Sequence, residues 1–280
     1  MRPTGIHLSY WTSHWSDDVF PFLQKARDAG FDGAELPLLD PGTMRYGDLR
    51  RQADQLGLRL TCCTGLPVDG DISHPDPGAR QRGVDHLMRC LDGAAEVGSP
   101  VLAGVLYLGW GAAIPESGCE LYIQRSAEVL RHVAVEAGKR HVTLCLEVLN
   151  RFESFFLNTV EEGRAFLNKI GSPFVKLNLD TCHLNIEEDS VAGAIRQAGK
   201  QLGHLHCTAN NRKRPGLGHL PWDEIKQALD AIDYQGWLIM ECFVRSGDEV
   251  GRTMRIWRPL SVDLDADARA GANFLKTRLS

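Results

Sequence analysis

The chain has 280 residues, of which 43% are hydrophobic, and its net charge at pH 7 is -5. This length and composition allow one sizeable core, and α/β barrels commonly fill such a length as a single domain. The acidic charge leaves no electrostatic footprint for nucleic acid, since no run of Lys and Arg is longer than the three residues 212–214. We therefore expect one domain, residues 1–280, that acts on a small molecule.

The sequence predicts a cytoplasmic protein without membrane or nucleic-acid partners. Its N-terminus, MRPTGIHLSYW, lacks the apolar segment of a signal peptide, and no stretch approaches the roughly 20 apolar residues that a bilayer span requires. Eight Cys are scattered without a CxxC pair. In a reducing compartment these are best interpreted as small buried hydrophobes, not as disulfides or zinc ligands.

Strands and helices alternate through the first half of the chain. Short apolar runs predict strands at residues 5–9, 33–36, 59–63 and 101–107, and amphipathic segments predict helices at 17–29, 48–56, 78–97 and 121–138. Glu35 stands near the end of the second strand, and Gly30 and Gly98 are helix stop signals. The loop at 65–77 is long enough to be functional, and such a loop would help to cover a site.

The second half repeats the pattern. Strands are predicted at 143–147, 175–180, 202–206 and 237–241, and helices at 159–170, 191–198, 222–232 and 266–279. Eight strands alternating with about eight helices, without a linker or a low-complexity segment, are typical of an α/β protein with parallel strands. The sequence therefore predicts a (β/α)₈ TIM barrel with a single domain.

Four consecutive predicted strands end on a metal-binding type of side chain. They close on Glu147, Asp180, His206 and Glu241. One strand-terminal acid is more often a helix cap or a surface residue, but the carboxyl ends of parallel strands meet at one face, where ligands bind. Three carboxylates and one imidazole suit Mn²⁺, Co²⁺ or Mg²⁺ better than a thiolate-seeking zinc. The pattern predicts a site for a divalent cation.

Several motifs resemble those of the D-tagatose 3-epimerase and D-psicose (D-allulose) 3-epimerase family, a branch of the xylose isomerase-like barrels. They are LEVLNRFE at residues 146–153, LDTCHLNIEE at 179–188, GHLHCTANNR at 203–212 and LPWDEI at 220–225. The similarity extends from HLSYWTSHW near the start, through TCCTGL, to IWRPL near the end. The first two motifs are highly specific, whereas LPWDEI alone is a weak signal.

The resemblance implies roles for individual residues. It makes Glu147, Asp180, His206 and Glu241 the ligands of one divalent metal per subunit, usually Mn²⁺ or Co²⁺. It also implies that Glu153, His183, Arg212 and Cys63 bind or line the sugar. Without the resemblance, Arg212 beside Lys213 and Arg214 would equally be a solvated charge. His183, three residues after Asp180, would equally be a partner that orients this metal ligand.

Two positions depart from the family pattern. Ala209 stands where the family often has Glu, and His7 stands where it often has Phe or Tyr. The first loosens the expected positioning of the ketose, and the second brings an imidazole near the far end of the substrate. Both bear on which sugar is preferred and not on the reaction.

The implied reaction inverts C3 of a free ketose, such as D-tagatose, D-fructose/D-psicose or L-ribulose, through a metal-stabilised enediolate. Inversion requires a base on one face and an acid on the other, which assigns catalysis to Glu147 and Glu241. Apolar walls for C4 to C6 are expected from Trp15, Tyr107 and Trp110. No Gly-rich cradle for a phosphate appears on the last two loops, which favours a free sugar.

Other functions fit part of the pattern. An aldose–ketose or hydroxypyruvate-type isomerase would use the same metal and carboxylates to move a proton between C1 and C2. A metal-dependent DNA endonuclease requires further His and Asp ligands and a basic groove, and a catalytically silent sugar-binding protein requires no proton transfer. Similarity to the family further implies a homodimer or homotetramer.

Overall fold

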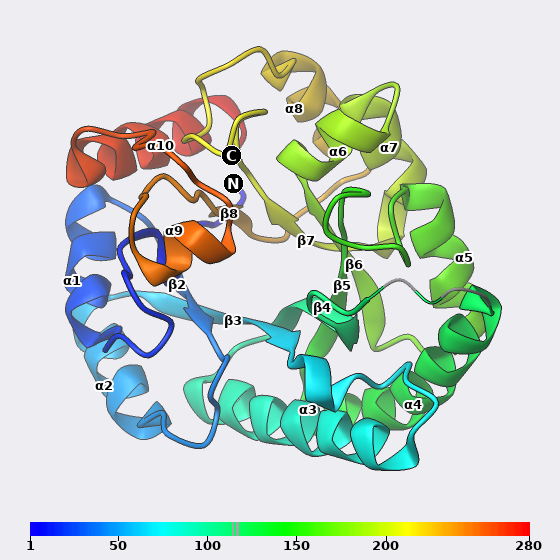
Figure 1. The fold of residues 1–280 in the computed structure, drawn as a ribbon. Coiled ribbons are helices and arrows are strands. Elements are labelled where there is room, and N and C mark those ends of the chain that lie inside the picture. Colours follow the sequence, from blue (N-terminus) through cyan, green and yellow to red (C-terminus); the bar gives the residue numbers. More distant parts are fainter. Residues whose placement is uncertain (114, 116–117) are drawn as a thin grey trace.

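A computed structural model describes residues 1–113, 115 and 118–280, and these form a closed barrel of eight parallel strands (Figure 1). The strands are β1 (Thr4–His7), β2 (Gly33–Pro37), β3 (Arg59–Leu66), β4 (Val101–Gly109), β5 (Thr143–Val148), β6 (Val175–Asp180), β7 (Leu202–His206) and β8 (Leu238–Met240). They are hydrogen-bonded in chain order, and β1 closes the barrel by pairing with β8. The predicted TIM barrel is confirmed.

Helices surround the barrel (Figure 1). They are α1 (Phe20–Ala29), α2 (Tyr46–Leu56), α3 (Pro77–Val97), α4 (Cys119–Lys139), α5 (Val160–Ile170), α6 (Thr181–Glu187), α7 (Val191–Ala198), α8 (Trp222–Ala231), α9 (Glu249–Thr253) and α10 (Leu264–Arg278). Each predicted helix has a counterpart among these. The short helices α6 and α9 were not predicted, because neither is long enough to show an apolar period.

The strands form because both of their faces are buried. Every residue of β1, β4 and β8 is buried, as expected for parallel strands between a packed barrel interior and a helix layer. The helices end where the sequence predicts: Gly30 and Gly98 adopt the left-handed conformation that stops α1 and α3. Thr159 begins α5 with a reciprocal capping box to Glu162.

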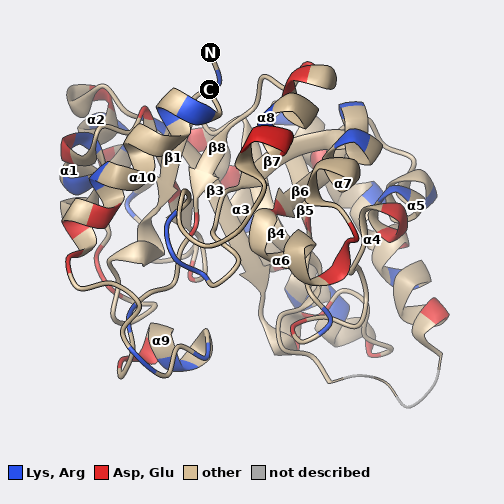
Figure 2. Ribbon diagram, turned by 90° about the horizontal axis from the view of Figure 1, so that it is seen from above, with Lys and Arg blue, Asp and Glu red and all other residues tan. Residues whose placement is uncertain are grey.

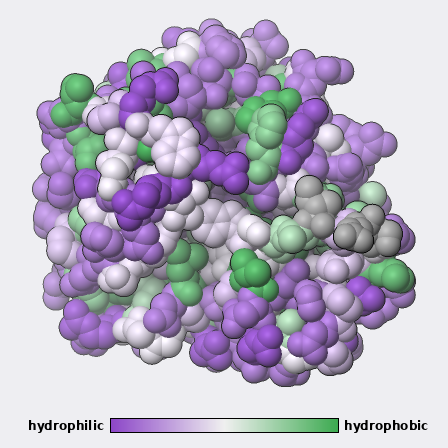
Figure 3. Space-filling view, viewed as in Figure 1, coloured by the Kyte–Doolittle hydropathy of each residue, from purple (hydrophilic) through white to green (hydrophobic). Residues whose placement is uncertain are grey.

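The two ends of the barrel differ. Both termini lie at one end of the barrel and α9 lies at the other (Figure 2). The end with α9 faces the viewer in Figure 1. The termini are tied together there, since Arg2 donates a 2.6 Å hydrogen bond to the carbonyl of Leu279. The mouth with α9 is framed by a largely hydrophilic surface with scattered hydrophobic patches (Figure 3). None of the described helices is apolar over the length that a bilayer crossing needs.

Candidate metal and active site

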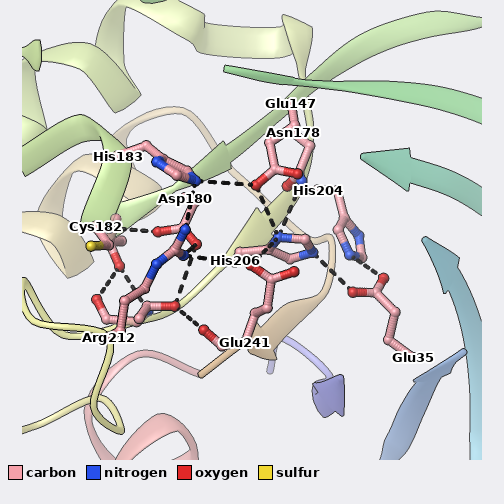
Figure 4. Close-up of polar contacts among 12 residues, drawn as sticks. Glu35, Glu147, Asn178, Asp180, Cys182, His183, His204, His206, Arg212 and Glu241 are labelled. Atoms are coloured by element: carbon pink, nitrogen blue, oxygen red, sulfur yellow. Dashed lines mark hydrogen bonds and ion pairs between the residues drawn. The ribbon is translucent and has the colours of Figure 1, made fainter. Parts of the chain in front are cut away.

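The four side chains predicted as metal ligands lie at the same end of neighbouring strands. Asp180 and His206 are the last residues of β6 and β7 and pair in register. Glu147 is the penultimate residue of β5, and Glu241 directly follows β8, one residue beyond the strand's observed end. All four are buried, and their side chains converge (Figure 4). The parallel barrel thus brings together residues up to 94 positions apart in the sequence.

These side chains present a compact set of donor atoms. One ligand atom from each of Glu147, Asp180, His206 and Glu241 lies within 4.8 Å of all the others. His206 Nδ1 is 3.5 Å from a carboxylate oxygen of Glu147 and 3.5 Å from one of Glu241. Three carboxylates buried this closely repel one another, so the cluster fits a bound cation. Oxygen donors with one imidazole fit Mn²⁺, Co²⁺ or Mg²⁺.

Glu35 lies beneath this cluster and bridges two imidazoles. Its carboxylate oxygens lie 2.9 Å from His206 Nε2 and 2.8 Å from His204 Nε2, and all three side chains are completely buried. Thr61 donates a further 3.0 Å hydrogen bond to Glu35. With a cation bound, a proton on Nε2 of His206, held by Glu35, would leave the lone pair of Nδ1 free to bind that cation.

Sequence reasoning gave Glu35 no role. Its partners are His204 and His206, which are 169 and 171 positions away. One sequence signal could have identified Glu35. It stands near the end of its predicted strand, as the acids predicted to bind metal do. A buried carboxylate in a short strand requires a partner, and the sequence does not identify it.

Arg212 joins the residues expected to bind substrate. Its guanidinium is 3.1 Å from Asp180, 3.3 Å from Glu153 and 3.1 Å from His183 Nε2. The side chain is only 13% exposed, so the alternative of a solvated charge is wrong. Its backbone adopts φ 63°, a conformation that L residues rarely take and that surrounding contacts must hold.

His183 is held by Asn150 and not by Asp180. Its Nδ1 accepts a 3.3 Å hydrogen bond from the backbone N–H of Asn150, whose side-chain amide lies 2.7 Å from the same atom. The same amide donates to Glu153 at 2.9 Å. The interpretation of His183 as a residue that orients Asp180 therefore has no support in its contacts. Nε2 of His183 lies 3.8 Å from a carboxylate oxygen of Glu147 and 3.1 Å from the guanidinium of Arg212, at the wall of the cavity.

Opposing charges set the protonation of the cluster. Burial raises the pKa of Glu147 to about 7, and the negative charge of Glu241 adds to this rise. Burial also disfavours ionised Glu241, but the charge of His206 outweighs it and holds the pKa of Glu241 below its usual range. Burial and the charge of Arg212 lower the pKa of His183 to about 4, so that this ring is neutral.

A cavity opens above the cluster. Its polar lining includes Glu147, Glu153, His183, Arg212 and Glu241. The remaining lining is His7, Trp15, Pro37, Leu39, Cys63, Thr64, Gly65, Gly104, Val105, Trp110, Leu149, Phe243 and Met254. Cys63, Trp15 and Trp110 lie in this lining, as expected.

Two expectations about the walls need correction. Tyr107 is fully buried outside the cavity lining, and its ring packs 5.0 Å from that of Phe156. Its strand position directs it into the packing between barrel and helices, so it forms no wall. Of the 65–77 loop, only Gly65 lines the cavity, because β3 continues to Leu66 and the next residues form a 3₁₀ turn, Val68–Gly70. Ala209 is completely buried and does not line the cavity.

The chain matches a family model described as xylose isomerase-like TIM barrel over residues 23–278. D-psicose 3-epimerase of Ruminiclostridium cellulolyticum is 38% identical over 96% of this chain and 95% of that protein. L-ribulose 3-epimerase of Mesorhizobium japonicum is 36% identical over 98% of this chain and 93% of that protein. The chain belongs to the ketose 3-epimerase family of xylose isomerase-like TIM barrels. It is an isomerase of the epimerase class.

Solved structures agree with this membership. A crystal structure of D-psicose 3-epimerase in the presence of D-fructose superposes with a TM-score of 0.94 at 36% identity, covering 99% of both chains. A family 2 AP endonuclease from Brucella melitensis superposes with a TM-score of 0.75 at 18% identity. At that identity the likeness shows a common fold alone. The resemblance noted in the sequence is therefore confirmed.

Proposed function

We propose that this protein is a metal-dependent ketose 3-epimerase that inverts C3 of free ketoses of the D-psicose, D-tagatose and L-ribulose type. The observation that carries the proposal is the pair Glu147 and Glu241, two buried carboxylates that line one cavity and belong to a four-donor cluster. Relatives named for this reaction, at up to 38% identity over nearly the whole chain, support it. The cofactor is one divalent metal per subunit, Mn²⁺ or Co²⁺, with Mg²⁺ as the third candidate.

The difficulty of the reaction is the low acidity of the C3–H bond. A divalent cation held by Glu147, Asp180, His206 and Glu241 would supply Lewis-acid polarisation of the neighbouring carbonyl and offset the negative charge of the enediolate. Whichever of Glu147 and Glu241 is ionised removes the C3 proton. The other, protonated, returns one to the opposite face, and their roles exchange in the reverse reaction.

Three side chains hold the substrate between the two carboxylates. Arg212, His183 and Glu153 bind the oxygens at C1 to C3, so that C3 stays within reach of both acids. The network that Asn150 makes with His183 and Glu153 keeps these groups in place before substrate binds. Cys63 lines the cavity with a thiol whose pKa burial raises well above its usual value, and it contributes a neutral wall.

The competing functions have less support. An aldose–ketose isomerase would act on the same cavity, and analysis of the products separates a C1–C2 shift from C3 inversion. The net charge of -5, and basic residues interspersed with acidic ones on the outer helices, do not favour an endonuclease (Figure 2). A silent sugar-binding protein would not need two buried acids astride the ligand.

We also infer a cytoplasmic homodimer or homotetramer. All eight cysteines are free thiols, which suits a reducing compartment. Phe152 and Trp257 expose 68% and 75% of their surface in the loops of the barrel mouth, and a partner subunit would cover such apolar side chains. Sedimentation equilibrium measures the assembly state directly.

The deciding experiment is a panel of free ketoses incubated with metal-free protein to which Mn²⁺ or Co²⁺ is added. We expect C3 epimers as products, and incorporation of deuterium at C3 when the reaction runs in heavy water. Products altered at C1 or C2 would favour the isomerase, and absence of exchange for every ketose would defeat the proposal.

A further inference from the structure

His7 brings an unused imidazole to the cavity. The ring is 5% exposed and lines the cavity at the end of β1. Its Nδ1 is buried and has no hydrogen-bond partner among the described residues. The other ring nitrogen, Nε2, is not among the buried unpartnered atoms, and no described residue forms a hydrogen bond to it. A ring that lines the cavity and turns Nδ1 away from solvent presents its other edge, with Nε2, to the cavity.

The position of His7 sets it apart from the charged residues of the cavity. Those residues follow β5 to β8, whereas β1 to β4 contribute mainly apolar side chains such as Pro37, Leu39 and Val105. Glu153, His183 and Arg212 hold the oxygens at C1 to C3 in the proposed function. The carbons from C4 onward must then extend toward the apolar half, where His7 lies.

We propose that His7 determines sugar specificity by hydrogen-bonding, through Nε2, to one hydroxyl group among those at C4 to C6 of the ketose. This inference rests on the proposed function, because it assumes that a ketose occupies the cavity with C3 between Glu147 and Glu241. The ligand class is a neutral polyol tail. A hydroxyl group both donates and accepts, so it pairs with either neutral tautomer of the ring.

The environment of His7 favours a hydroxyl group over an anion. Burial lowers the pKa of His7, and the nearby carboxylates of Glu241 and Glu35 do not compensate for it. The ring is therefore neutral at pH 7, and those two carboxylates would repel a phosphate or carboxylate on the sugar tail. Its ring centroid lies 6.4 Å from that of Phe243, another cavity-lining residue, so an aromatic side chain borders the imidazole.

The test compares D-fructose with its 4-, 5- and 6-deoxy analogues. For one analogue, loss of the hydroxyl group leaves Nε2 unpaired, and we expect kcat/KM of the wild type to fall about tenfold. In His7→Phe, which keeps an aromatic ring but has no hydrogen-bonding nitrogen, the ratio of kcat/KM for D-fructose to that analogue should fall toward one. A ratio unchanged in His7→Phe for all three analogues would overturn the proposal.

Two further variants identify the atom that makes the contact. The side-chain amide of His7→Gln reaches the position of Nε2 and should restore part of the selectivity. The shorter amide of His7→Asn reaches only the position of Nδ1 and should behave like His7→Phe. Selectivity kept by Asn and lost in Gln would contradict the assignment to Nε2. Ser9→Ala is the control, since it removes a buried hydroxyl group near His7 that does not line the cavity, and it should keep the wild-type ratio.

Binding measurements separate this inference from the proposed function. If the wild type exchanges the C3 proton of no ketose, the proposed function fails. Calorimetric binding of D-fructose and its deoxy analogues to wild type and His7→Phe then still measures the hydroxyl contact: a difference confined to the wild type supports the His7 contact, and equal affinities refute it. Epimerisation by the wild type together with unchanged selectivity in His7→Phe leaves the function intact and removes only the role of His7.

Discussion

The two halves of the barrel mouth are built differently. The charged residues of the cavity lining all follow β5 to β8, and hydrogen bonds or ion pairs connect them to one another. The half formed by β1 to β4 contributes apolar side chains, glycines, a thiol, Thr64 and His7. Under the proposed function, this difference corresponds to a division of labour, in which one half would perform the chemistry and the other would select the tail of the sugar.

Beneath the cavity the two halves are joined. Glu35 comes from β2, in the apolar half, and hydrogen-bonds to two imidazoles of β7. This contact crosses the interior of the barrel, where the pKa of Glu35 is held well below its usual value by the adjacent His204 and His206, against the opposing effect of burial. The division into halves therefore applies to the cavity lining and not to the support of the metal ligands.

The largest expected effect comes from neutralising either acid of the charged half. Glu147→Gln and Glu241→Gln each remove a proton acceptor or donor while keeping shape, and we expect kcat to fall about 10³-fold or more. Deuterium incorporation at C3, followed by NMR, measures the loss, and metal analysis shows whether some metal stays bound. Glu120→Gln, at an exposed ion pair with Lys169, is the control. Appreciable turnover by Glu241→Gln would rule out the scheme with two carboxylates.

Changing the residue that joins the halves tests the support of the ligands. In Glu35→Gln an amide nitrogen replaces one carboxylate oxygen. The side chain then has a single acceptor oxygen and cannot accept hydrogen bonds from both His204 and His206. We expect the affinity for Mn²⁺ to fall about 10- to 100-fold, measured by calorimetric titration of metal-free protein. Thr61→Val removes only the hydrogen bond to the Glu35 oxygen that faces His204, so its effect should be smaller. Equal effects of both variants would show that Glu35 does not act through His206.

The charged half also predicts how metal binding depends on pH. In the metal-free protein Glu147 has a pKa of about 7, raised by burial and by Glu241. A ligand must lose its proton to bind the cation, so below pH 7 the proton competes, and apparent affinity should fall by up to about tenfold per pH unit. Above pH 7 the contribution of Glu147 should disappear. The remaining dependence comes from His206, which must also lose a proton and whose pKa is raised well above its usual value by Glu241 and Glu35, against the effect of burial. Titrations of Co²⁺ between pH 5.5 and 8 would measure the pH dependence, and Glu147→Gln should lose the additional steepness below pH 7. An equally steep fall below pH 7 in this variant would contradict the assignment to Glu147.

The sequence predicted most of this fold because its hydrophobic patterns and helix stop signals specify the same strands and helices that the barrel contains. Buried strands showed apolar runs, and Gly30 and Gly98 ended helices where expected. The strand ends located the metal cluster, since the end of a parallel strand fixes where the next side chains lie. Glu35 was not assigned, because its role depends on partners across the barrel. Tyr107 was placed wrongly, because an apolar run does not show which face of a strand looks into the cavity.

The smallest effect is expected for Ser9→Ala. This variant tests whether an unpartnered polar group affects sugar selectivity only when its residue lines the cavity, as His7 does. Ser9, just after β1, has a buried hydroxyl group without a partner among the described residues, but it does not line the cavity. Ser9→Ala should leave sugar selectivity unchanged and raise Tm by up to about 2 °C, because an unpaired hydroxyl group is removed from a buried site.

Ser126→Ala is the matched control for this measurement. Its hydroxyl group donates a 2.6 Å hydrogen bond to the carbonyl of Tyr107, and its loss should lower Tm by about 2–4 °C. A change of sugar selectivity in Ser9→Ala would mean that unpaired polar groups in this half act on specificity through packing, and the contrast drawn for His7 would lose its basis.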